Sequence, residues 1–122
     1  MLLSLMRGAS LSEALRSKVK RSPAKHARAI KPHAEKAAQL LKALANEQRL
    51  MILCNLLEGP LLVGELNERL DLSQSALSQH LAVLRELKVV VTTSEAQNVR
   101  YSLPEGVVTQ IIAVLYKEFC EG

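Results

Sequence analysis

Aromatic residues are almost missing from this 122-residue chain, which contains two tyrosines, one phenylalanine and no tryptophan. Its hydrophobic residues, 48% of the total, are therefore mainly leucine, isoleucine, valine and alanine. Such an aliphatic composition favours helices packed on helices around one core. The length fits one domain, and it is small enough that a partner chain would help to cover apolar surface.

Several functional signatures are also missing. No apolar run reaches the length of about 18 residues that a membrane-spanning helix needs. Charges follow the apolar start at once, so no secretory signal is expected, although a basic amphipathic leader stays an alternative. There is no glycine-rich phosphate loop, nucleophile motif or plausible pair of acid and base carboxylates, so we do not expect an enzyme. The two cysteines, Cys54 and Cys120, lie far apart and form no CxxC motif, which excludes a cysteine-based zinc framework.

Acidic residues are scarce only at the N-terminus. Residues 1–32 contain eight basic residues and one acidic residue, whereas residues 33–122 contain eight basic and eleven acidic residues. The formal net charge of +4 therefore comes from the first segment, and the remainder is net acidic. Overall charge gives no argument that the globular part binds nucleic acid, so such a claim must depend on local geometry.

We divide the chain into a basic N-terminal arm, residues 1–32, and a domain, residues 33–122. The arm is expected to be disordered or partly helical, with a short helix over residues 11–19 and interruptions at Pro23 and Pro32. A mobile solvated tail is the plain interpretation. There are two alternatives. The arm could touch phosphates, or the true start of the chain could lie later than Met1.

Apolar residues at three- and four-residue steps predict the helices of the domain. A first helix begins near His33, and a second follows an Asn46 cap and ends at Gly59-Pro60. A short third helix covers residues 63–70, and Ser73 caps a fourth over residues 74–88.

Two strands and a last helix complete the predicted domain. Residues 89–93 and 99–103 predict the strands of a hairpin. The last helix is expected to start near Pro104. Because it is apolar over more than one face, we expect it to contribute to a subunit interface.

The fourth helix has two different sides. Leu77, Leu81 and Leu84 form a narrow apolar side, and small polar residues occupy the opposite side. A short helix, a tight link, a capped second helix and a two-stranded ribbon together predict a winged helix-turn-helix. The expected fold class is therefore mainly α with a two-stranded β-wing, and an ordinary amphipathic surface helix is the plain alternative.

A recognition helix needs small polar side chains near its N-terminus, where they enter the major groove and reach base edges. The predicted DNA contacts are Gln74, Ser75, Ser78, Gln79, His80, Arg85 and Arg100. Among them, His80 lies beside the apolar side, where a packed or hydrogen-bonded structural histidine is more usual. A plain surface role is the alternative for Arg100, which lies on the second strand.

Three segments carry a resemblance to a known family: ANEQRLMILCNLL, VGELNERLDLSQSALSQHLAVLRELKVV and AQNVRYSL. They resemble the ArsR/SmtB family of bacterial repressors, over about residues 34–120. The resemblance implies a helical core with a β-wing and a homodimer built on the first and last helices. It also implies binding to double-stranded DNA at an inverted-repeat operator in the bacterial cytoplasm.

Many members of this family sense metals, but the residues of their sites are missing here. One type of metal site in the family lies on the third helix and needs paired cysteines near residues 63–66, which are Val-Gly-Glu-Leu here. A second type lies on the last helix and needs Asp and His, and residues 109–120 contain neither. We therefore expect no metal site and no cofactor, and we expect His26 and His33 to be exposed to solvent.

The positions of Cys54 and Cys120 resemble the thiol-redox and reactive-sulfur-sensing subgroup that includes HlyU and BigR. The resemblance implies that the two thiols form a disulfide or polysulfide bridge when an oxidant or reactive sulfur species is present. The residues alone favour a plainer interpretation, in which Cys54 is a core residue and Cys120 an incidental tail thiol.

The sequence departs from the family in three places. Leu62 stands where a Ser or Thr cap is common, so the third helix is expected to start less sharply. Residues 86–89, Glu-Leu-Lys-Val, lack the glycine common at the end of the recognition helix. The basic arm is longer than the family pattern needs.

The leading hypothesis is a repressor whose operator affinity is switched by oxidation or persulfidation of Cys54 and Cys120. A constitutive or antagonist DNA-binding regulator without a switch, a metal-sensing repressor with an unrecognised site, and a protein-interaction module stay open as alternatives.

Overall fold

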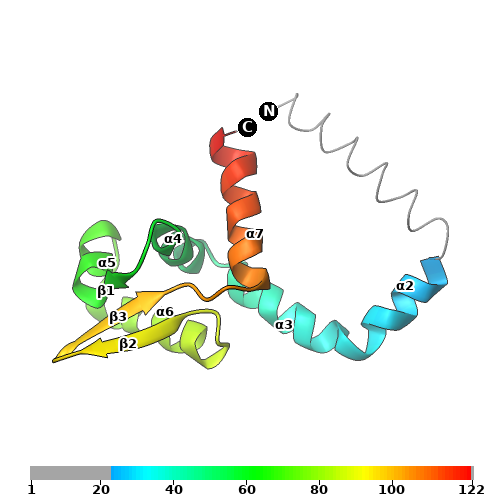
Figure 1. Cartoon of the computed structure of the whole chain (residues 1–122), viewed down its shortest axis with the longest axis horizontal. Helices are drawn as coiled ribbons and strands as arrows, with labels where there is room; N and C mark the ends of the chain where they lie inside the picture. Colours follow the sequence, from blue (N-terminus) through cyan, green and yellow to red (C-terminus); the bar gives the residue numbers. More distant parts are fainter. Residues whose placement is uncertain (1–22, 122) are drawn as a thin grey trace.

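The computed structural model describes residues 23–121, so the helix predicted over residues 11–19 lies outside the described residues. In chain order, the elements are α2 (Pro23–Ile30), a 3-10 turn η1 (Lys31–His33), α3 (Ala34–Leu44), α4 (Glu47–Leu56), β1 (Leu61–Leu62), α5 (Val63–Arg69), α6 (Gln74–Glu86), β2 (Val91–Glu95), β3 (Asn98–Ser102), α7 (Val107–Tyr116) and a π-helical turn η2 (Lys117–Glu121). Figure 1 shows a helical body with a β-hairpin on one side and a long helical extension on the other.

The predicted helix caps are confirmed. Asn46 Oδ1 accepts a hydrogen bond from Arg49 N at 3.1 Å, and Ser73 Oγ accepts one from Ala76 N at 3.1 Å. Each side chain satisfies a backbone N–H that has no partner within its helix. These two bonds define the first residues of α4 and α6.

The start of α5 is better defined than Leu62 suggests. A leucine side chain offers no acceptor, but Glu65 Oε1 accepts the Leu62 backbone N–H at 2.8 Å. This is the reciprocal half of a capping box, in which the third residue of the helix reaches back to the cap. The glutamate therefore fixes a boundary that we expected to be loose.

The sheet has three strands rather than the two that the sequence predicted. Its order is β1-β3-β2, and both pairings are antiparallel. Tyr101 is buried in the central strand, where it pairs with Leu61 on one side and Thr92 on the other. A strand of two residues is too short to show an alternating pattern, which is why β1 was not predicted. We call the β2–β3 hairpin the wing.

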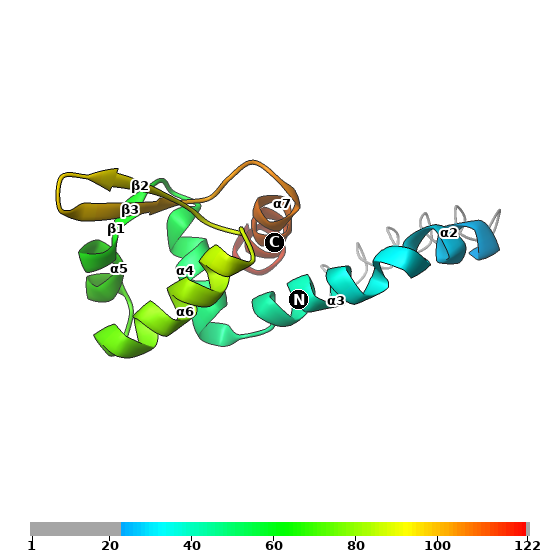
Figure 2. The ribbon, with the colours of Figure 1, turned by 90° about the horizontal axis from the view of Figure 1, so that it is seen from below.

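Leucine and isoleucine side chains fill one core between α4, α5, α6 and α7. The largest fully buried side chains are Ile52, Leu53, Leu66, Leu77, Leu84 and Ile112. By contrast, α2, η1 and α3 form a helical rod that leaves this body, and only the carboxyl end of α3 is buried in it (Figures 1 and 2). Pro32 sits in the first turn of η1, where a missing N–H does not interrupt the helical path.

The last helix begins three residues later than predicted, at Val107. Gly106 precedes it with φ of 154°, a conformation that side chains rarely adopt. Thr109 Oγ1 donates a hydrogen bond to the Pro104 carbonyl at 2.6 Å and holds this turn against α7. Pro104 therefore belongs to the turn and not to the helix.

At the end of α6, a lysine takes the position where glycine is common. Lys88 has φ of 60°, in the left-handed region. Its N–H donates to the Arg85 carbonyl at 2.9 Å, and the Val89 N–H donates to the Leu84 carbonyl at 3.0 Å. This pair of bonds is a Schellman motif, and the buried side chains of Leu84 and Val89 add its usual apolar contact. A lysine thus occupies a backbone position that suits glycine.

We expect Lys88→Gly to raise the free energy of unfolding by about 1 kcal/mol, because a left-handed L-residue costs about 1–2 kcal/mol and glycine removes most of that cost. For a domain of this size the melting temperature should rise by roughly 4–8 °C. Calorimetry at fixed protein concentration measures the change. Lys88→Ala is the matched control, because it removes the same side chain but keeps the strain. Equal melting temperatures for the two variants would contradict the assignment of strain.

Candidate DNA-binding interface and thiol pair

The structure places the predicted polar face of α6 at the surface. Gln74, Ser75, Ser78 and Gln79 are all exposed. On the opposite side, Leu77, Leu81 and Leu84 are 0–2% exposed and anchor the helix in the core. The first turn of α6 therefore presents hydroxyl and amide groups to solvent on a rigid helix. These groups have the size and chemistry to read base edges in a major groove.

His80 is placed differently from the other predicted contacts. It is half-buried, and its Nδ1 accepts a hydrogen bond from Arg49 Nε at 3.4 Å. Arg49 Nη1 also donates to the Ala43 carbonyl at 3.4 Å. One guanidinium therefore connects the carboxyl end of α3, the first turn of α4 and the middle of α6. This geometry favours the structural role for His80.

Sequence reasoning missed Arg49. Its position three residues after Asn46 marks it only as the residue whose backbone N–H the cap accepts. Nothing in the local pattern indicates a partner as distant in the chain as His80. The side chain acquires its role only when α3, α4 and α6 are packed together.

The two predicted arginines differ in their surroundings. Arg85 is exposed in the last turn of α6. Arg100, on β3, forms an ion pair with Glu95 on β2, with Nε to Oε1 at 3.1 Å and Nη2 to Oε2 at 3.3 Å. The hydrogen bond and charge of Glu95 raise the pKa of Arg100. The pair orients Arg100 on the wing, but it also offsets part of the charge available to a phosphate.

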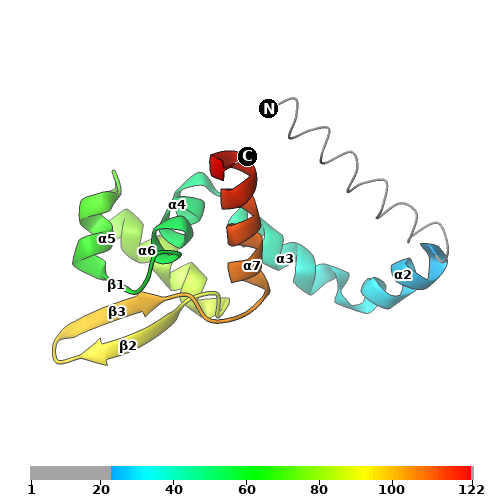
Figure 3. The same ribbon diagram turned by 45° about the horizontal axis from the view of Figure 1, so that its top comes forward.

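Cys54 and Cys120 are free thiols in this structure. Cys54 is half-buried on α4, and Cys120 is exposed in η2 at the end of the chain. Burial raises the pKa of Cys54, and the charge of Cys120 raises it further. The helix α4, which carries Cys54, lies beside α7, which continues into the η2 turn that carries Cys120 (Figures 1 and 3). The two thiols do not lie next to each other.

Within residues 23–121, no three His, Cys, Asp or Glu side chains are grouped so that they could hold a metal ion. His26 and His33 are exposed, as predicted. None of the helices in the described part of the chain is long and apolar enough to cross a membrane.

Comparison with known proteins agrees with this geometry. Residues 46–91, which contain α4, α5 and α6, match the model of the bacterial regulatory protein arsR family. The chain is 52% identical over 93 residues to the transcriptional activator HlyU of Vibrio cholerae, covering 76% of this chain and 86% of that protein. It is 45% identical over 92 residues to the biofilm growth-associated repressor of Agrobacterium fabrum, covering 75% and 79% of the two chains.

The chain belongs to the ArsR family. The structure of reduced HlyU from Vibrio cholerae superposes with a TM-score of 0.72 and covers 76% of this chain and 98% of that one. The repressor BigR from Xylella fastidiosa, 39% identical, gives a TM-score of 0.69 and covers 76% and 95%. The resemblance to the HlyU and BigR subgroup is therefore confirmed. The chain is a DNA-binding transcriptional regulator of this family, and its relatives are regulators and not enzymes.

We expect Arg49→Gln to lower the free energy of unfolding by about 1–2 kcal/mol, because the half-buried His80 and the carbonyl of the buried Ala43 lose their donor. Urea unfolding measures the loss. The matched control is Arg69→Gln, which removes an exposed ion pair with Glu58 at 3.6 Å. Exposed pairs contribute roughly 0–1 kcal/mol, so the control should change little. Equal losses in the two variants would show that Arg49 has no special role in joining the helices.

Proposed function

We propose that this ArsR-family regulator binds an inverted-repeat operator as a homodimer, acts as a repressor, and loses operator affinity when Cys54 and Cys120 are oxidised or persulfidated. The observation that carries the DNA-binding part is the exposed polar face of α6, held by buried leucines on its other side. Gln79 and Ser78 are its central side chains. Gln74, Ser75, Arg85 and Arg100 would add contacts around them.

Exposed apolar side chains on α3, α7 and η2 support the homodimer. Leu41, Val107, Val114, Tyr116 and Phe119 are 46–73% exposed. Apolar surface on this scale in a small domain favours burial against a second copy. A twofold dimer would also present two copies of α6 at a fixed separation, as two half-sites one helical turn apart require.

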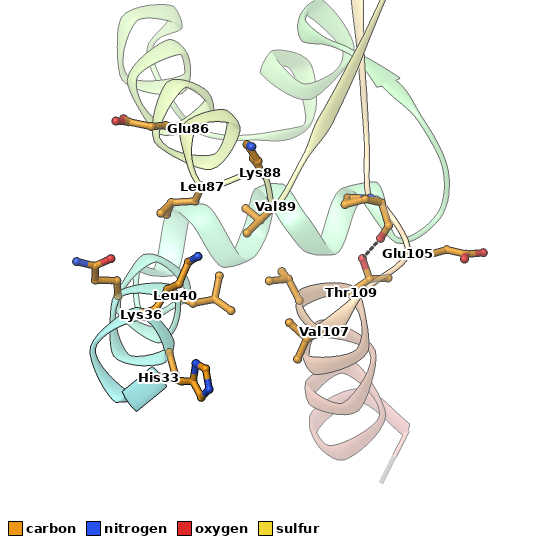
Figure 4. A pocket seen from close by; sticks show the side chains of 15 residues that line it. His33, Lys36, Leu40, Glu86, Leu87, Lys88, Val89, Glu105, Val107 and Thr109 are labelled. Carbon is orange, nitrogen blue, oxygen red and sulfur yellow. Dashed lines mark hydrogen bonds between the residues drawn. The ribbon is translucent and has the colours of Figure 1, made fainter. Parts of the chain in front are cut away.

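A pocket of about 600 Å³ lies next to this apolar surface, between α3, the end of α6 and the start of α7. Figure 4 shows Leu40 of α3, Leu87 after α6 and Val107 of α7 around it, with Lys36 and Lys88 nearby. The pocket therefore borders both the proposed dimer surface and the end of the recognition helix. A side chain of the second copy that enters it would touch both.

The proposed switch begins at Cys120, because it is exposed while Cys54 is half-buried with a raised pKa. With hydrogen peroxide, the Cys120 thiolate attacks one oxygen, the O–O bond breaks, and a sulfenic acid and hydroxide form. The Cys54 thiolate then attacks the Cys120 sulfur and expels a second hydroxide, leaving a disulfide. With a low-molecular-weight persulfide, Cys120 takes the outer sulfur and releases a thiol, and attack by Cys54 on the Cys120 sulfur releases hydrosulfide.

The bridge would change the dimer through α7. A disulfide needs Cα atoms within about 7 Å, so η2 must move toward α4 before the bond can close. Residues of α7 and η2 carry much of the exposed apolar surface, including Val114 and Phe119. Moving them against α4 would shift the second copy and hence the separation of the two recognition helices.

A second candidate function follows from the name of one relative. HlyU of Vibrio cholerae is described as an activator, whereas the Agrobacterium relative is described as a repressor. The same α6 contacts would serve an antagonist that displaces another DNA-binding protein, with or without a thiol switch. Transcription measured from an operator-containing promoter with no other regulator present distinguishes the two, because only a repressor lowers it.

We expect the double variant Ser78→Ala/Gln79→Ala to lose at least about tenfold in affinity for a duplex selected from a random-sequence pool, since each base contact is worth about 1–3 kcal/mol. Fluorescence anisotropy with the selected duplex and a scrambled one measures the loss. Affinity for the scrambled duplex should stay the same, because backbone contacts are kept. Equal losses on both duplexes would argue against base recognition by α6.

We expect peroxide or glutathione persulfide to lower the affinity of the native chain for that duplex and to leave Cys54→Ser and Cys120→Ser unaffected. Iodoacetamide should label Cys120 before Cys54, and Cys54 labelling should accelerate with pH above the ordinary thiol range, because its raised pKa delays thiolate formation. Mass spectrometry should show the bridge within one chain after peroxide treatment. Unchanged affinity in a chain that carries the bridge would exclude the switch but leave DNA binding intact.

A further inference from the structure

We propose that the basic side of α2 is a second DNA-contacting surface, which binds phosphates outside the groove occupied by α6. The inference depends on the proposed operator binding and adds a separate electrostatic contact to it. Its starting point is the uneven distribution of charge between the rod and the rest of the described chain.

Lys25 and Arg28 of α2 and Lys31 of η1 follow one another at three-residue steps. At about 100° per residue, this spacing places them on one side of the helical path, within an arc of roughly 120°. No acidic residue occurs between Pro23 and Ala34. The side chains of residues 24–36 are all exposed, so this basic side is open to solvent along the outer part of the rod.

The body of the domain offers few cations for phosphate binding. Residues 34–121 contain eight basic and eleven acidic residues. Three of these basic residues are already engaged: Arg49 with Ala43 and His80, Arg69 with Glu58, and Arg100 with Glu95. Duplex DNA carries one negative charge per ~1.7 Å of axis, so a net-acidic domain meets general repulsion when it approaches. A basic segment of the same chain would offset it.

The figures place the rod where such a contact is possible. Seen from below in Figure 2, α6 and the α2–η1–α3 rod both lie on the near side, and α7 lies behind them. In Figure 1 the rod extends away from the body, and both α6 and the rod lie below α7, whose free end rises to the top of the view. DNA held by the exposed face of α6 would therefore lie on the side of the molecule along which the rod extends.

A polyanion would also stabilise α2 itself. Like charges three or four residues apart on an exposed helix destabilise it. Lys25, Arg28 and Lys31 repel one another in this way, and nearby phosphates would relieve the repulsion. An acidic surface of a second copy is the competing partner for the same side chains, and the experiment separates the two.

The test compares Lys25→Gln/Arg28→Gln with Lys42→Gln/Lys117→Gln in the full chain. Both double variants lose two positive charges, and Lys42 and Lys117 are exposed lysines outside α2. Affinity for the selected duplex is measured by anisotropy between about 0.05 and 0.3 M salt. The slope of log K against log salt changes by about 0.9 for each phosphate that the protein no longer neutralises. The slope for the α2 variant should therefore be shallower than the native slope by up to about 1.8. The loss of each such phosphate contact lowers affinity about eightfold at 0.1 M salt, if binding in 1 M salt is unchanged.

The control variant should keep most of the native slope, and sedimentation should show native assembly for both variants. An unchanged slope in the α2 variant, or the same decrease in both variants, would overturn the inference. A loss of dimer only in the α2 variant would also overturn it, because the basic side would then bind the second copy. Absence of binding by the native chain would instead contradict the proposed operator binding, so the two failures are distinguishable.

Discussion

The packing of three leucines beneath α6 is the constraint on which the rest of the site depends. Leu77, Leu81 and Leu84 fix the rotation of the helix about its axis, and this rotation decides which side chains are exposed. A rotation of one residue, about 100°, would bury polar groups and expose a leucine. The capped start at Ser73 and the Schellman end at Lys88 fix where the helix begins and ends. The polar face is thus set by contacts on the opposite side of the helix.

The positive charge of this chain and the polar face of α6 lie in different segments. The domain that carries α6 is net acidic, while the positive charge is concentrated before it. Phosphate contacts supply affinity with little sequence preference, whereas base contacts supply specificity. If α2 supplied phosphate contacts and α6 supplied base contacts, affinity could change without a change in specificity, and specificity without a change in affinity. Arg49, which contacts α6, and Arg100, on the wing, instead take part in bonds within the protein.

The sequence was sufficient for elements that depend on local patterns. The caps at Asn46 and Ser73 and the two sides of α6 are short-range properties, and each was predicted correctly. Features created by packing were not predictable in the same way. The strand β1 exists only because β3 lies beside it, and Arg49 meets His80 only after three helices have assembled. The start of α7 was misplaced at Pro104 because proline is common both in the first turns of helices and in the turns that precede them.

The short strand β1 has a mechanical consequence. It joins the wing to the connection between α4 and α5 through the pairing of Leu61 with Tyr101 and Leu62 with Arg100. The pairing therefore ties the base of the hairpin to the body and restricts its movement relative to α6. If α6 enters a major groove as proposed, the wing would lie beside that groove. A duplex whose grooves match the separation of α6 and the wing would need little bending, and one that differs would incur an elastic cost at bases the protein never touches.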